Sequence, residues 1–265
     1  MSKRDTTPTH ASDGWTHPSI VSNYEGRGYI LPAEVRAFAE CATHMADGLI
    51  LDIGVGAGRT IPFIEPGASR YVAIDLSPPM VEAARERFPH ADIRLGDALA
   101  LPFSDGEFSF VLFSFNGIDY IDPGDRPRAL DEIARVLRQG GRFVFSTHNL
   151  RARSSVEGRF ELNLPKLSPN PFRTAVRLAR AVRYSIIAYR NFRRLRGFER
   201  VEPDIAFVND GAHDYALLTC YISPAAQVRA LEKAGFAVLR IIGESGDDAT
   251  VQSNDAWLHF VAEKR

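Results

Sequence analysis

The chain has 265 residues, of which 45% are hydrophobic, and its formal net charge at pH 7 is −1. This length suffices for a large domain with a sizeable core, and the composition is that of an ordinary globular protein. The near-zero net charge argues against binding to nucleic acid or membranes through the charge of the whole chain. The two cysteines, Cys41 and Cys220, form no C-x-x-C pair, which argues against a disulfide framework or a structural zinc site.

The first part of the chain predicts a frayed start and then a helix. Residues 1–14 are polar and are expected to be disordered, and no stretch of the sequence reaches the roughly 20 apolar residues of a membrane-spanning helix. We therefore expect a cytoplasmic protein. Residues 15–47 form an N-terminal helical segment, in which Pro32 suits the first turn of a helix with apolar residues at helical spacing.

Strand-like and helical patterns alternate after this segment. Apolar runs predict strands at 48–53, 70–75, 91–96 and 108–115, and helical patterns cover 59–65, 78–88 and 126–139. Gly140 is expected just after the last of these helices, and a fifth strand follows it. Near the C-terminus Ser223 and Pro224 start another helix, which precedes two final strands. The alternation predicts an α/β fold, doubly wound around a mostly parallel sheet with helices on both faces.

The interval 150–222 breaks the alternation and is too long for a simple loop. We expect an inserted cap over the carboxyl edge of the sheet, so the core comprises 48–149 and 223–265. Apolar spacing between Phe172 and Phe198 predicts one or two amphipathic helices. Nine arginines lie between Arg173 and Arg200, and three interpretations stay open for them: a solvated cap helix, contact with an anionic or lipid-like substrate, or nucleic-acid binding.

A glycine-rich turn follows the first predicted strand. The run 49–53 leads into Gly54, Gly56 and Gly58, spaced G-x-G-x-G, which is typical of a strand that breaks into a tight turn before a helix. Glycines let the backbone approach a ligand, and the N-terminus of the helix favours anionic or polar groups. A dinucleotide fingerprint would need glycine or alanine at position 59, where Arg59 stands, so the spacing disfavours NAD.

Two acidic residues follow the next two strands. Asp75 lies 21 residues after Gly54, close to the distance at which such folds place a carboxylate for the hydroxyls of a ribose. The alternative role of Asp75 is to cap the helix that begins near Pro78. Asp97 follows Gly96 at the end of the third predicted strand. Its carboxylate can accept a hydrogen bond from an adenine amine, although aspartate is also a common turn former.

The motif D-x-G-x-G-x-G, followed by Asp75 and then Gly96-Asp97-Ala98, closely resembles class I S-adenosylmethionine-dependent methyltransferases. The resemblance covers roughly 45 to 148 and, more weakly, 223 to 263. It implies a seven-stranded sheet whose last strand is antiparallel and lies between the fifth and the sixth. It also implies that S-adenosyl-L-methionine is the cofactor and that S-adenosyl-L-homocysteine is the product.

The resemblance assigns the cofactor site residue by residue. Asp52 and the three glycines would hold the amino-acid end, Asp75 the ribose, and Asp97 with Ala98 the adenine, which Leu76 and Met80 would flank. The 15–47 segment and the end of the fourth strand would complete and close the pocket. The full expected set is Asp52, Gly54, Gly56, Gly58, Asp75, Leu76, Met80, Asp97, Ala98, Phe115, Asn116, Tyr24 and Arg27.

Methyl transfer from a sulfonium is an in-line displacement, in which positioning and exclusion of water supply much of the rate. An oxygen or nitrogen acceptor must also lose a proton, and a histidine can accept it. Our first candidate for this base is His148, after the fifth strand, and the second is His213 in the cap; Tyr120, Asn149 and Tyr215 are candidate substrate contacts. Neither histidine has the spacing of a metal ligand, so no metal is expected.

The sequence therefore favours an enzyme that methylates an oxygen or nitrogen of a small-molecule metabolite. Gly117-Ile118-Asp119-Tyr120 departs from the (D/N)PP(Y/F) signature of many enzymes that methylate nucleic-acid amines, which argues against a nucleic-acid partner. An RNA or other macromolecular methyltransferase that uses the arginine-rich cap is one alternative. A non-catalytic module that only binds S-adenosylmethionine is another. The sequence does not predict the oligomeric state.

Overall fold

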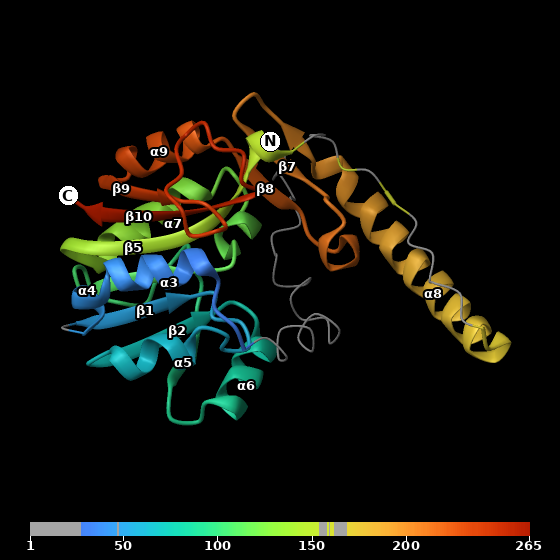
Figure 1. Cartoon of the computed structure of the whole chain (residues 1–265), viewed down its shortest axis with the longest axis horizontal. Helices are drawn as coiled ribbons and strands as arrows, with labels where there is room; N and C mark the ends of the chain where they lie inside the picture. The colour runs from blue at the N-terminus through green and yellow to red at the C-terminus, as the bar shows by residue number, and fades with distance from the viewer. Residues whose placement is uncertain (1–27, 47, 154–157, 159, 162–168) are drawn as a thin grey trace, which may run out of the picture.

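The protein is built around one twisted sheet (Figure 1). This computed structural model describes residues 28–46, 48–153, 158, 160–161 and 169–265. Five strands run in parallel in the order β3-β2-β1-β4-β5. They are β1 (Leu49–Ile53), β2 (Arg70–Asp75), β3 (Asp92–Leu95), β4 (Phe108–Phe113) and β5 (Leu137–Asn149). Strand β10 (Trp257–Lys264) is antiparallel and lies between β5 and β9 (Phe236–Ile242), which confirms the predicted fold class.

Helices cover both faces of the sheet because side chains of the buried strands alternate between two cores. Leu51 and Ile53 point to a core shared with α7 (Arg126–Val136) and α9 (Pro224–Lys233). Ile50 points to the opposite core, which helices from the first third of the chain complete. These are α3 (Pro32–Glu40), α4 (Ala42–Ala46), α5 (Ile61–Ile64) and α6 (Pro78–Arg87), and a 3₁₀ turn η1 (Glu65–Gly67) follows α5.

Most predicted elements occur where they were expected, but the end of α7 differs. The helix stops at Val136, and Leu137 already begins β5, where it is fully buried and pairs with Phe108. Gly140 therefore lies inside the strand, with φ +71°, at an irregularity in the register between β4 and β5. The prediction that Gly140 follows a helix ending at residue 139 is wrong, because the burial of Leu137 favours the strand.

The interval 150–222 contains a long helix, as predicted, and also strands that were not predicted. After η3 (Leu150–Ala152) come α8 (Pro171–Leu195), η4 (Arg196–Phe198), β6 (Arg200–Val201), β7 (Ile205–Val208), η5 (Ala212–Tyr215) and β8 (Thr219–Ile222). Strand β8 pairs with the end of β5 through His148 and Asn149, so the interval extends the sheet to ten strands. Helix α8 projects from the body of the molecule as an arm (Figure 1). None of the helices in the described ranges is both long and apolar enough to span a membrane.

A buried ion pair holds α3 against the turn that follows β1. Arg59 donates to both carboxylate oxygens of Glu34, at 2.8 and 2.5 Å, and the two residues are only 6% and 1% exposed. The same guanidinium donates to the backbone carbonyl of Tyr29 and to Ser114 Oγ. One side chain therefore links the segment before α3, the glycine turn and the end of β4.

Removing the acid of this pair should be costly, because it leaves the Arg59 charge buried without its partner. We expect Glu34→Ala to lower the free energy of unfolding by about 3–5 kcal/mol. Glu40→Ala is a matched control on the same helix, since Glu40 pairs with Arg36 and Arg240 at the surface and should contribute less than about 1 kcal/mol. Urea denaturation of both variants checks this, and equal losses would contradict the role given to Glu34.

Candidate active site

A cavity opens at the edge where the carboxyl ends of the parallel strands meet, which is the usual ligand site of such sheets. The end of β1, the glycine turn, the end of β2, the turn after β3 and the segment after β4 all contribute to its wall. The lining residues are Ile53, Gly54, Gly56, Asp75, Leu76, Met80, Gly96, Asp97, Ala98, Phe113, Ser114, Phe115, Gly117, Tyr120 and Ile121.

Glycine is required in the turn after β1 for conformation and for space. Gly54, Gly56 and Gly58 have φ values of +67°, +56° and +84°. A Cβ on Gly54 would lie 2.8 Å from the Phe113 ring, and one on Gly58 would lie 2.6 Å from the Phe88 ring. Gly54 and Gly56 line the cavity, whereas Gly58 is absent from its wall and serves the packing of the turn.

Asp75 sits at the end of β2 and faces the cavity. Its Oδ2 accepts a hydrogen bond from the backbone N–H of Gly56 and its Oδ1 accepts one from that of Ser77, both at 2.8 Å. Burial raises the pKa of this carboxyl, while the two backbone donors oppose the shift. Each carboxylate oxygen still has a lone pair for another donor. The carboxylate thus orders the residue that precedes α6 and also faces the cavity, and its binding of a ribose stays a prediction.

The turn after β3 provides the opposite wall. Asp97 Oδ1 accepts a hydrogen bond from the backbone N–H of Leu99 at 2.9 Å, and this bond orients the carboxylate. The bond does not use the other carboxylate oxygen, Oδ2. Ala98, Leu76 and Met80 line the cavity beside it, as the sequence analysis expected. The wall also contains residues that were not among the predicted site residues, namely Ile53, Gly96, Phe113, Ser114, Gly117 and Ile121. For Gly96, Ser114 and Gly117 the position soon after a strand end was the available signal.

Asp52 lies beneath the turn, outside the cavity wall. Its side chain is fully buried, and Oδ2 accepts hydrogen bonds from Thr60 Oγ1 at 2.5 Å and from the Tyr71 hydroxyl at 2.9 Å. Oδ1 has no partner among the described residues, and burial raises the pKa of this carboxyl to about 6. In this structure Asp52 supports the turn from below.

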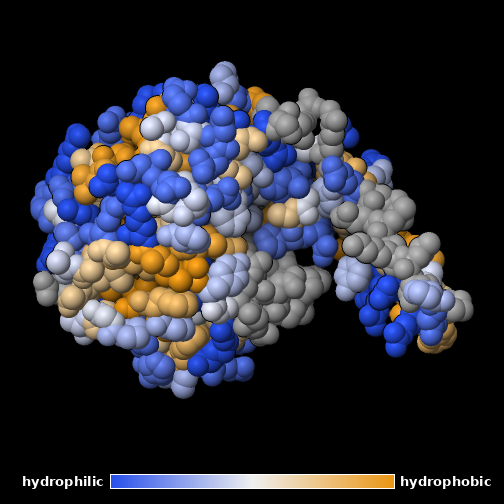
Figure 2. All heavy atoms as spheres, viewed as in Figure 1, coloured by the Kyte–Doolittle hydropathy of each residue, from blue (hydrophilic) through white to orange (hydrophobic). Residues whose placement is uncertain are grey.

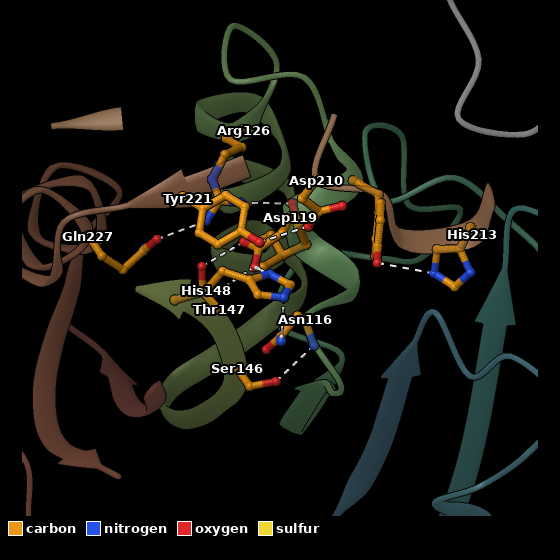
Figure 3. A network of polar contacts seen from close by, with 12 residues as sticks. Asn116, Asp119, Arg126, Ser146, Thr147, His148, Asp210, His213, Tyr221 and Gln227 are labelled. Carbon is orange, nitrogen blue, oxygen red and sulfur yellow. Dashed lines mark hydrogen bonds and ion pairs between the residues drawn. The ribbon is translucent and has the colours of Figure 1, made fainter. Parts of the chain in front are cut away.

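His148 and Asp119 form a pair beside the cavity (Figure 3). His148 Nδ1 lies 2.7 Å from Asp119 Oδ2, which also accepts from the His148 backbone N–H at 2.6 Å. Because an ionised carboxylate only accepts, Nδ1 carries the proton and Nε2 presents a lone pair when the ring is neutral. Nε2 faces Asn116 Nδ2 at 3.3 Å, and Asn116 Oδ1 has no hydrogen-bond partner among the described residues.

Asp119 is fully buried and is fixed by two further donors. Its Oδ1 accepts from Thr147 Oγ1 at 2.6 Å and from Arg126 Nη1 at 2.8 Å. Arg126 in turn donates to Gln227 on α9, so the network crosses from β5 to the C-terminal helix (Figure 3). The pairing of Asp119 with His148 could not be predicted from the sequence, since the two are 29 residues apart in the chain.

Aromatic residues connect His148 with the cavity wall. The ring of Trp257 lies 5.6 Å from that of His148 and 5.0 Å from that of Phe115, which lines the cavity. On another side, Tyr120 lines the cavity and its hydroxyl lies 3.3 Å from His213 Nε2. His213 therefore contacts a wall residue directly, whereas Trp257 lies between His148 and the wall residue Phe115; neither histidine belongs to the wall itself.

The remaining predicted residues lie elsewhere. Asn149 donates to the backbone carbonyls of Ser253 and Asp255 and so holds the segment before β10. Tyr215 packs with Phe192 and Phe160 at the base of α8. Neither lines the cavity, and neither does Asn116, whose backbone N–H is held by Ser146 Oγ. Tyr24 and Arg27 lie outside the described residues.

Within the described ranges, no cluster of three or more His, Cys, Asp or Glu side chains could hold a metal ion.

Comparison with known proteins shows that part of the chain resembles methyltransferases in sequence. A family model described as a methyltransferase domain matches residues 50–141. The chain is 36% identical over 96 residues to a demethylmenaquinone methyltransferase of Renibacterium salmoninarum, which covers 36% of this chain and 39% of the relative. It is 35% identical over 116 residues to the Thermus thermophilus protein of the same name, covering 41% and 51%. The chain thus spans about two fifths to one half of the length of these relatives.

Solved structures share the fold over most of the chain. An S-adenosylmethionine-dependent methyltransferase from Clostridium acetobutylicum superposes with a TM-score of 0.62 at 14% identity, covering 88% of this chain and 91% of that one. A glycopeptide N-methyltransferase in complex with S-adenosylmethionine gives a TM-score of 0.55 at 21% identity, covering 90% and 95%. At these identities the likeness shows the fold alone.

The raised pKa of Asp52 predicts a pH-dependent contribution to stability. The folded value of about 6 exceeds the ordinary 3.8, so the native state binds this proton more tightly than the unfolded chain. The contribution of this group to the free energy of unfolding is therefore complete below about pH 4 and falls by about 3 kcal/mol as the pH rises to about 6. Asp52→Asn should gain stability relative to wild type over that window, as measured by urea denaturation. Asp105→Asn, at the surface, is the control; a constant difference for Asp52→Asn would contradict the assignment.

Proposed function

We propose that this chain, a member of the class I S-adenosylmethionine-dependent methyltransferases, moves a methyl group from that cofactor to an oxygen or nitrogen of a small molecule. The observation that carries the proposal is one cavity that collects the glycine turn, Asp75 and Asp97 at the ends of three neighbouring strands. The methyltransferase domain match over residues 50–141 supports the same reaction.

The lining residues fit S-adenosylmethionine. Positive-φ glycines leave the backbone of the turn bare, the fixed carboxylate of Asp75 suits a cis-diol, and Asp97 suits an exocyclic amine. Leu76, Met80 and Ala98 offer apolar contact to a flat ring. We assign the amino-acid end of the cofactor to the turn at Gly54 and Gly56, the ribose to Asp75 and the adenine to Asp97 and Ala98. In its bound state this cofactor supplies an electrophilic methyl group.

We assign the role of base to His148. Its side chain is 14% exposed and its ring is oriented from one side by the buried Asp119, which stabilises the positive charge that the ring gains with a proton. An acceptor hydroxyl or amine would replace the long Asn116 contact and give its proton to Nε2. The rings of Phe115 and Tyr120 in the cavity wall, with Trp257 packed against Phe115, favour an aromatic acceptor.

The names of the relatives favour a small acceptor. Several are called demethylmenaquinone methyltransferases, which suggests a small-molecule substrate for this chain too. Two assays separate the proposed enzyme from the macromolecular and the non-catalytic alternatives. Calorimetric titration with S-adenosylmethionine and S-adenosylhomocysteine tests cofactor binding, and transfer of labelled methyl to a metabolite extract tests the enzyme. Absence of affinity for both nucleosides would overturn the proposal, and binding without transfer to any metabolite would favour the alternatives.

Asp75→Ala should weaken S-adenosylmethionine binding, because the ribose hydroxyls lose their acceptors and the turn loses the bond to Gly56. We expect a loss of about 1–3 kcal/mol in binding free energy. Asp92→Ala is the control, since Asp92 starts β3 at the far edge of the sheet and pairs with Arg94 at the surface. Isothermal titration of both variants decides the point, and equal affinities for Asp75→Ala and wild type would remove Asp75 from the site.

His148→Gln should lower kcat by roughly 10²- to 10⁴-fold with little change in cofactor affinity, because only the proton transfer is lost. His90→Gln is the matched control, since that ring is at the surface beside Glu65. A kcat in His148→Gln equal to that of wild type would show that His148 is not the base.

A further inference from the structure

The arm formed by α8 is the part of the chain that the proposed reaction does not use. The helix has 25 residues, a length of about 37 Å, and contains seven arginines and no acidic residue. Asn170 caps its start by accepting hydrogen bonds from the backbone N–H groups of Phe172 and Arg173. The arm extends well beyond the sheet (Figure 1), and hydrophobic and hydrophilic residues both reach its surface (Figure 2).

Among the described residues, the last turns of α8 pack against the body. Ala188 and Phe192 pack against Tyr215 and Phe160, and Leu195 joins a second cluster with Phe207. Asn191 adds a hydrogen bond to the backbone carbonyl of Asp214 in η5. These contacts fix the direction of the helix without covering its earlier turns.

A row of large apolar side chains is exposed along the arm. Leu178, Val182, Ile186 and Tyr189 follow one another at spacings of four, four and three residues, so they lie on one side of the helix. Their exposed fractions are 40%, 58%, 48% and 47%, and Phe172 near the tip is 76% exposed. Exposure of such a row to water is unfavourable, so we infer that another surface covers it.

The charge of the arm identifies the kind of surface. An exclusively basic helix is complementary to a negatively charged partner, and a second copy of the same arm would repel it. Nucleic acid would engage the arginines but would leave the aliphatic row in water. A membrane with anionic lipids satisfies both features, because headgroup phosphates attract arginine while aliphatic side chains enter the boundary of the acyl chains.

We propose that α8 is an interfacial helix that binds anionic membrane surfaces, with Leu178, Val182 and Ile186 inserted at the boundary between headgroups and acyl chains. The row then lies in the plane of the membrane surface and the arginines lie among the phosphates. This proposal goes beyond methyl transfer and does not depend on it.

Vesicle flotation tests the proposal with the full chain. Wild-type protein should float with vesicles of phosphatidylcholine and phosphatidylglycerol, should not float with phosphatidylcholine alone, and should be released by high salt. Ile186→Glu should lower the bound fraction roughly tenfold, because a charge would have to enter the apolar boundary. Leu239→Glu is the matched control: Leu239, on β9, is 47% exposed against 48% for Ile186, and its variant should bind like wild type.

Three results would overturn the proposal. They are no binding to anionic vesicles, equal binding by Ile186→Glu and wild type, or binding to a generic RNA without binding to vesicles. A further contrary result would be that the wild-type protein self-associates but does not bind vesicles, and that Ile186→Glu abolishes the self-association. The partner of the apolar row would then be a second copy of the chain and not a membrane. S-adenosylmethionine titration of Ile186→Glu shows that the variant is folded and keeps the outcome separate from that of the proposed function.

Discussion

Parallel pairing of β3, β2, β1 and β4 is the constraint on which the site depends, because it brings the carboxyl ends of four strands to one edge. The hydrogen bond from the Gly56 N–H to Asp75 joins two of these ends directly. It fixes the glycine turn against the acid that faces the same cavity. The side of the cavity that we propose for the cofactor is therefore set by backbone geometry and by one carboxylate, and the buried Glu34–Arg59 pair secures the turn from the other side.

The side that we propose for the methyl acceptor is organised differently, through side chains that are far apart in the chain. Asp119 collects donors from β5 and α7, and the resulting network orients a single histidine beside the aromatic end of the cavity. Strand β8 pairs with β5 at His148, so the inserted interval is part of the support of this residue. Through η5, the same interval connects the cavity rim at Tyr120 with the base of α8.

The cavity wall at the ends of β1 to β3 could be predicted from the sequence because each of its features is local: a strand, then a glycine or an acid at its end. Asp75, Asp97 and Gly54 were found in this way. The pairing of His148 with Asp119 could not be predicted, since it depends on how β5 lies beside the turn after β4. The strands β6 to β8 were missed because runs of two to four residues carry little periodicity. Nor could helical spacing within α8 show that its apolar row is exposed.

The most direct measurement of the central claim is a crystal structure of the chain with S-adenosylhomocysteine. The account predicts the ribose hydroxyls on Asp75, the adenine between Leu76 and Ala98 with its amine on Asp97, and the sulfur directed toward the aromatic end near His148. A nucleoside bound elsewhere, or bound in this cavity with its sulfur directed away from His148, would contradict the account.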